Sequence, residues 1–161
     1  MGKSETVYIN SLAEVPGAIQ AAVGRMVNEI GEINWSDVLS EQIPALEKMH
    51  AGYFAGQRDA GGASWAALSA TTVAKKGHGR ILDETGALRA SLTSSGAGAV
   101  RRVSGRELKF GTSVRYATYH QNGFYNVRVN RSVPARPPVG ISQEGMIQIA
   151  TQVADQIVQR L

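Results

Sequence analysis

The chain has 161 residues, 43% of them hydrophobic, and a formal net charge of +4, which fits one soluble globular domain. It has no cysteine, which excludes disulfides, thiolate zinc sites and cysteine nucleophiles, and its three histidines share no metal-ligand spacing. No apolar run approaches the roughly 20 residues of a membrane helix, and Met1–Asn10 lacks the apolar core of a signal peptide. We therefore expect cytoplasmic synthesis and no membrane partner.

Helical periodicity is the main signal of the first half and of the C-terminal end. Apolar residues recur at three- and four-residue spacing over 11–30 and again over 36–54, where Pro44 predicts a kink or split near Glu41. Helices are predicted over 11–30, 36–54, 69–76, 85–92 and 142–161, with N-caps at Ser11, Ser36 and Thr85.

Two-residue alternation predicts strands in the second half. Residues 97–103 and 107–111 indicate a β-hairpin, while 116–120 fits a short strand or a helical turn, and 124–130 fits a strand or a limb of an extended loop. The predicted fold is α+β, with an antiparallel β-meander packed against N-terminal helices and a C-terminal helix. We expect a single domain over 1–161, divided into a helical part (1–56), a loop and short helix (57–80), the meander with an extended arm at 122–140 (81–140), and a C-terminal helix (141–161).

The stretch 114–140 concentrates aromatic, basic and proline residues. Prolines fix the backbone at low entropic cost, and Tyr and Arg are the side chains that most often anchor protein contacts. The stretch therefore predicts a protein interface. Its candidate residues are Tyr116, Tyr119, His120, Gln121, Phe124, Tyr125, Arg128, Arg131 and Arg136.

An enzyme is the weaker interpretation of the same stretch. His120 could serve as a general base, but the stretch 114–140 contains no Asp or Glu to orient it. We expect no catalytic residues, no cofactor, no metal and no small-molecule substrate. His120 and Gln121 are instead predicted to hydrogen-bond a turn that positions the arm.

The charge is unevenly distributed along the chain. Residues 1–60 hold four basic and eight acidic residues, whereas residues 61–161 hold thirteen basic and five acidic ones. A basic half can face nucleic acid, meet the acidic half of a neighbouring copy, or simply be solvated. The candidate DNA-facing residues are Arg101, Arg102, Arg106, Lys109 and Arg115.

The order of short motifs after residue 65 resembles the phage virion morphogenesis family, which groups the tail-completion proteins of P2-type phages with the Mu-type G proteins. The resemblance covers about residues 65–161, whereas the first helical half carries no matching motif. Pro138 stands where the family usually has a bulky apolar residue. The matching residues are Trp65, Leu68, Ser69, Thr72, Lys75, Ile81–Leu82, Thr85–Arg89, Ser91, Tyr116–Ala117, His120–Gln121, Gly123, Pro134–Pro137 and Gly140.

This resemblance implies a structural protein of a tailed phage and no catalysis or cofactor. The protein would complete or terminate the tail and join it to the head through a homo-oligomeric ring, by analogy a hexamer. Its expected partners are other copies of itself, the tail tube or sheath protein, the head–tail connector proteins and, non-specifically, the passing DNA. The expected location is the tail or neck of the virion, after assembly in the host cytoplasm. The alternative is a small basic nucleic-acid-binding protein.

Overall fold

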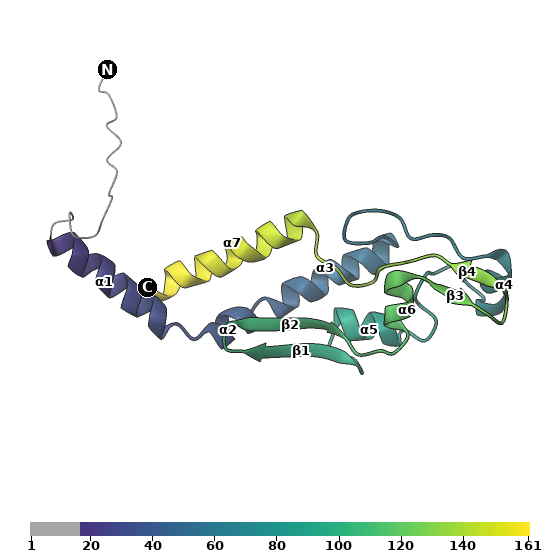
Figure 1. Ribbon diagram of the computed structural model, residues 1–161, viewed down its shortest axis with the longest axis horizontal. Helices are drawn as coiled ribbons and strands as arrows, with labels where there is room; N and C mark the ends of the chain where they lie inside the picture. The colour runs from purple at the N-terminus through teal and green to yellow at the C-terminus, as the bar shows by residue number, and fades with distance from the viewer. Residues whose placement is uncertain (1–16) are drawn as a thin grey trace, which may run out of the picture.

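The computed structural model describes residues 17–161 and shows an elongated molecule with α3 and the β1–β2 hairpin along its middle (Figure 1). Helices alternate with two antiparallel hairpins, which confirms the predicted α+β class. The elements in chain order are α1 (Gly17–Glu32), α2 (Trp35–Ser40), α3 (Ile43–Gly56), α4 (Ala70–Lys76), α5 (Ala87–Thr93), β1 (Ala99–Ser104), β2 (Glu107–Thr112), α6 (Ala117–Asn122), β3 (Phe124–Asn126), β4 (Arg131–Val133) and α7 (Gln143–Arg160).

The first helices follow the sequence pattern with shifted ends. The predicted start of the first helix at Ser11 lies outside the described residues, and α1 continues to Glu32, past its predicted end. The predicted split near Glu41 is confirmed, because α2 ends at Ser40 and Pro44 occupies the first turn of α3. The N-cap of α2 is Asn34 rather than Ser36, since the Asn34 side chain accepts a hydrogen bond from the Ser36 amide at 3.1 Å.

The N-cap of helix α5 lies one residue later than predicted. Gly86, with φ of +75°, is the N-cap instead of Thr85, because the backbone enters the helix through a left-handed conformation that glycine adopts without strain. The apolar face of α5 packs on α3 and the β1–β2 hairpin, so that Leu88 and Leu92 are buried. Together with residues from four other segments they form the core: Phe54, Trp65, Ile81, Leu88, Leu92 and Ala117.

The strands form two separate two-stranded sheets, so the predicted meander, a single sheet of consecutive strands, is wrong. β1 pairs with β2 in the register from Ala99↔Thr112 to Ser104↔Glu107. β3 pairs only with β4, from Phe124↔Val133 to Asn126↔Arg131. Helix α6 separates the two hairpins, and the β3–β4 hairpin lies at the end of the molecule opposite α1 (Figure 1).

The predicted extended arm consists of a hairpin, residues 124–133, and an extended segment, residues 134–140, which we call the strap and which forms the base of the arm. Residues 124–133 fold into β3 and β4, and residues 134–140 run in an extended conformation along the molecule towards α7 (Figure 1). Ser142 caps α7 by accepting a hydrogen bond from the Gly145 amide at 2.9 Å. The arm therefore has an anchored base and a projecting tip.

Candidate interaction surfaces

The base of the arm is fixed inside its own chain. Arg136 is only 6% exposed, and its Nε and Nη2 donate hydrogen bonds to the carbonyl oxygens of Ala66 (2.6 Å) and Ala67 (3.0 Å). Its main-chain amide donates to the His120 carbonyl at 2.7 Å. The structure therefore places Arg136 as an internal brace, which corrects its prediction as an exposed interface residue.

Gln121 and His120 position this base, as the sequence predicts, but by different means. The Gln121 side-chain amide donates to the Val139 carbonyl at 3.0 Å and accepts from the Val139 amide at 3.2 Å. His120 contributes its backbone carbonyl, while its ring lies half-buried beside Tyr116 and Phe124. Burial lowers the pKa of His120, and the cations of Arg136 and Lys76 lower it further. Both residues thus belong to the arm's support.

The tip of the arm, residues 125–131, is exposed. Val127 and Val129 at its turn are 78% and 55% exposed, and Arg128 and Arg131 beside them are also exposed. Tyr125 lies on the outward face of β3 and its hydroxyl donates to the Asn130 side chain. On α6, Tyr119 is exposed and packs against the half-buried Phe124 with ring centroids 5.6 Å apart. Of the predicted interface residues, the exposed ones that a second molecule could reach are Tyr116, Tyr119, Tyr125, Arg128 and Arg131.

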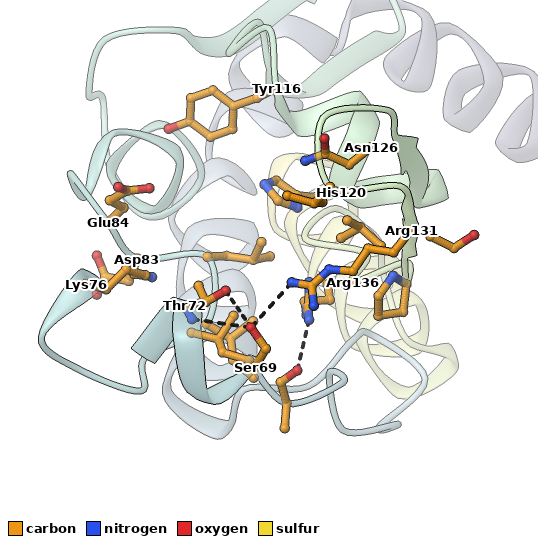
Figure 2. Close-up of a pocket in the computed structure, with 18 of the residues that line it drawn as sticks. Ser69, Thr72, Lys76, Asp83, Glu84, Tyr116, His120, Asn126, Arg131 and Arg136 are labelled. Carbon is orange, nitrogen blue, oxygen red and sulfur yellow. Dashed lines mark hydrogen bonds between the residues drawn. The ribbon is translucent and has the colours of Figure 1, made fainter. Parts of the chain in front are cut away.

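A groove of about 600 Å³ separates the inner face of the β3–β4 hairpin from α4 and the loop that follows it (Figure 2). Figure 2 shows Arg131 and Arg136 on the hairpin side of the groove, and Lys76, Asp83 and Glu84 on the opposite side. Asp83 already lies 3.8 Å from Arg80 and 3.6 Å from Arg89. Apolar and aromatic side chains complete the lining, including Leu68, Ile81, Leu82, Tyr116, Val129 and Val133.

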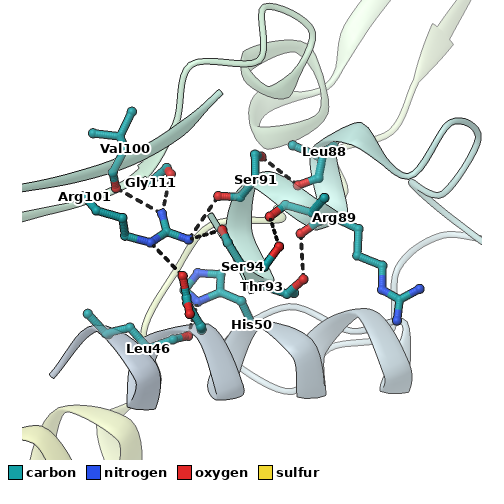
Figure 3. Close-up of polar contacts among 12 residues, drawn as sticks. Leu46, His50, Leu88, Arg89, Ser91, Thr93, Ser94, Val100, Arg101 and Gly111 are labelled. Carbon is teal, nitrogen blue, oxygen red and sulfur yellow. Dashed lines mark hydrogen bonds and ion pairs between the residues drawn. The ribbon is translucent and has the colours of Figure 1, made fainter. Parts of the chain in front are cut away.

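The predicted DNA-facing cluster is divided by the structure. Arg101 points inward, because its guanidinium bonds Glu47 at 3.1 Å and donates to four main-chain carbonyl oxygens (Figure 3). The guanidinium also lies 3.8 Å from the centre of the Phe110 ring. Its side chain is 11% exposed, so its prediction as a DNA-facing residue is corrected. The other members of the cluster are exposed: Arg102, Arg106, Lys109 and Arg115.

His50 lies beside Arg101 in a buried polar site that sequence reasoning missed. Its Nδ1 donates to the Leu46 carbonyl at 2.7 Å, and its ring packs 4.9 Å from Phe110. Burial lowers the pKa of His50, outweighing the opposite effect of the Leu46 carbonyl, and Arg101 lowers it further. The sequence did contain a signal that Arg101 is not exposed, because residues 99, 101 and 103 alternate with Arg102 and so Arg101 lies on the same face of the strand as Ala99 and Val103.

The described part of the chain, 17–161, contains no group of three or more His, Cys, Asp or Glu side chains that could hold a metal ion. None of the helices over the same residues is long and apolar enough to cross a membrane.

Comparison with known proteins places the chain in a family. The phage virion morphogenesis family matches residues 17–158, which extends the resemblance from the C-terminal part into the first helices. No curated protein and no solved structure matches the chain. On the family match the chain belongs to the phage virion morphogenesis family, and its role lies in the assembly of the phage virion.

Proposed function

We propose that the protein completes or terminates the tail of a tailed phage and joins the tail to the head as a homo-oligomeric ring, most simply a hexamer. The family supports a part in virion assembly. The observation that carries the finer assignment is the arm, whose tip of exposed aliphatic, aromatic and arginine side chains stands on a base braced by Arg136 and Gln121.

The arm tip has the properties of a protein-binding element. Val127 and Val129 are largely exposed apolar side chains, and Tyr125 and Arg128 belong to the residue types that dominate interface energetics. Association costs less free energy when the binding element is ordered beforehand. The hydrogen bonds at the base supply this order without occupying the tip.

The elongated shape allows head-to-tail contacts between copies. The arm tip lies at one end of the long axis, so it can contact the far end of a neighbouring copy (Figure 1). Repeated head-to-tail contacts close into a ring when the rotation between copies allows it. The flat faces of such a ring would meet the tail tube or sheath protein on one side and the head–tail connector on the other, in the tail or neck of the virion.

The test combines solution mass with phage assembly. Wild-type protein at micromolar concentration should show a discrete multiple of the 17.1 kDa chain by native mass spectrometry. A phage lacking the gene should accumulate separate heads and tails, and supplied wild-type protein should restore infectious particles. The variant Val127→Asp should fold, run as a monomer and fail to restore them. Normal head–tail joining without the gene would contradict the proposal.

A second candidate function, contact with DNA passing through the ring, has its own observation. Arg102 and Lys109 lie directly opposite each other across β1 and β2, and like charges in that position are destabilising. Glu107 relieves only part of this repulsion, at 3.6 Å from Lys109. A phosphate backbone would relieve the rest.

Retention on duplex DNA tests this contact. The wild type should bind at 50 mM salt and release as salt rises, because phosphate contacts release counterions. Arg102→Gln with Lys109→Gln should weaken binding and reduce its salt dependence. Arg80→Gln, which removes an exposed arginine away from the hairpin, serves as the control. No retention of the wild type at 50 mM salt would remove DNA from the set of partners, and equal retention of all three proteins would show that Arg102 and Lys109 do not contact it.

A further inference from the structure

Helix α1 has an exposed apolar face that no other element of the described residues 17–161 covers. Met26, Val27 and Ile30 lie on one side of the helix and are 52%, 61% and 37% exposed. Figure 1 shows α1 leading away from the body, to which it is joined through Ile33 and Asn34. A helix of 16 residues with glycines at 24 and 31 is at best marginal in water without packing. The face calls for a partner.

The charge of α1 narrows the choice of partner. Glu29 and Glu32 lie in its last turn, which contains no basic residue, and Arg25 is the helix's single cation among the described residues. Carboxylates near the C-terminus of a helix add to the negative end of its dipole and are unfavourable there. A partner that presents cations next to apolar surface would offset this cost and cover the exposed side chains.

We propose that the partner is the arm end of a second copy, with α1 of one molecule docked against the groove and arm tip of the next. The arm end joins exposed apolar side chains, Val127 and Val129, to the cations Arg128 and Arg131. Lys76 and Tyr116 extend this surface into the groove. This inference rests on the proposed ring and names the two surfaces that build it.

The two surfaces match in apolar character and in charge. An amphipathic helix binds a groove through side chains three and four residues apart, and Ile30 follows Val27 by three residues and Met26 by four. Glu29 flanks the apolar face of α1, three residues after Met26, and is placed against Arg128 and Arg131. The groove carboxylates lie on the opposite wall, where Asp83 has its own arginine partners. The pairing also matches the acidic first part of the chain with the basic second part.

Because α1 and the arm end lie at opposite ends of the molecule, each copy can form this contact with two neighbours. Figure 1 places α1 at one end of the long axis and the β3–β4 hairpin at the other. A molecule can therefore offer its α1 to one neighbour and its arm end to another. This contact is heterologous, and it closes into a ring or runs on as a filament.

Charge reversal tests the pairing. The α1 variant carries Glu29→Lys with Glu32→Lys, and the arm variant carries Arg128→Glu with Arg131→Glu. Each alone should keep the wild-type thermal midpoint but assemble at least tenfold more weakly, because like charges then face each other. Mixed in equal amounts, the two variants should form rings in which they alternate, since every contact then joins opposite charges. A matched control, Glu144→Lys with Asp155→Lys on exposed positions of α7, should leave assembly unchanged.

The outcomes separate this inference from the proposed function. If the wild type forms rings and either variant does so equally well, the pairing of α1 with the arm end is wrong while the ring stands. If both variants are folded monomers and their mixture stays monomeric, α1 is not the occupant of the arm end. If the wild type itself is monomeric at micromolar concentration in solution and in tail preparations, the ring and this inference fall together.

Discussion

The indole Nε1 of Trp65 donates a hydrogen bond of 3.1 Å to the carbonyl oxygen of Pro137, 72 residues later in the chain. Trp65 is buried, and its ring meets Phe54 of α3 edge-on, with centroids 5.4 Å apart. The bond therefore ties the strap at the base of the arm directly to the core. It explains why residues 134–140 lie against their own chain although prolines prevent them from joining a sheet.

Replacing Trp65 should loosen the arm base. Trp65→Phe keeps most of the ring but leaves the Pro137 carbonyl unpaired, which should lower the free energy of unfolding by about 1–2 kcal/mol. Trp65→Ala should cost about 3–5 kcal/mol. The matched control is Trp35→Phe, because the buried Trp35 Nε1 has no hydrogen-bond partner to lose. Urea unfolding followed by far-UV circular dichroism measures all three, and an equal loss for both Phe variants would contradict this role of the indole bond.

Substitution of Arg101 should destabilise the fold, whereas the same substitution of its neighbour Arg102 should have little effect on stability. Arg101→Met leaves Glu47 and several main-chain carbonyl oxygens without their donor in a site that is mostly buried, so it should destabilise the fold by about 2–4 kcal/mol. Arg102→Met, on the exposed face of the same strand, should change stability by less than about 0.5 kcal/mol. Thermal and urea denaturation compare the two. Similar losses for both would mean that the buried network does not stabilise the hairpin.

Stability should fall as the pH drops below neutrality. His50 and His120 both have pKa values lowered from 6.5, chiefly by burial, so the unfolded chain binds protons at a pH where the folded chain does not. The stabilisation is complete above about pH 6.5 and is lost as the pH falls towards the folded pKa values, by up to about 1.4 kcal/mol per pH unit for each histidine.

Two substitutions isolate the histidine contribution. The free energy of unfolding of the wild type, His50→Gln, His120→Gln and the double variant is measured by urea titration from pH 8 to pH 5. Each single variant should lose about half of the slope between pH 6.5 and 5, and the double variant should lose most of it. Carboxylates dominate the pH dependence instead if the slope persists in the double variant.

What the sequence could predict depends on the range of the interaction. The β1–β2 hairpin and helix α7 follow from local alternation and periodicity, and Pro44 located the break between α2 and α3. The role of Arg136 could not be read in this way, because its partners Ala66 and Ala67 lie about seventy residues away. The same holds for the groove, which exists only because the hairpin folds back beside α4. Composition predicts the arm as an interface, whereas tertiary packing determines that Arg136 is buried and that Arg128 and Arg131 are exposed.

Gly123 connects α6 to the arm, and its substitution tests whether the base controls the tip. It has φ of +73° and ψ of 168°, a conformation that is nearly exclusive to glycine, and a Cβ there would lie 2.9 Å from both the Ala135 amide nitrogen and the Val133 carbonyl oxygen. Gly123→Ala should therefore cost about 2–4 kcal/mol or displace the hairpin.

Gly79→Ala is the matched control for Gly123→Ala, since a Cβ at Gly79 meets nothing within 4 Å. Limited proteolysis should cut Gly123→Ala within residues 124–133 faster than it cuts the wild type or Gly79→Ala, while the core fragment survives. A tip on a loosened base loses more conformational entropy when it binds, so Gly123→Ala should also assemble more weakly. If the arm of Gly123→Ala is cut faster yet the variant assembles like the wild type, the order of the base is irrelevant to the interface.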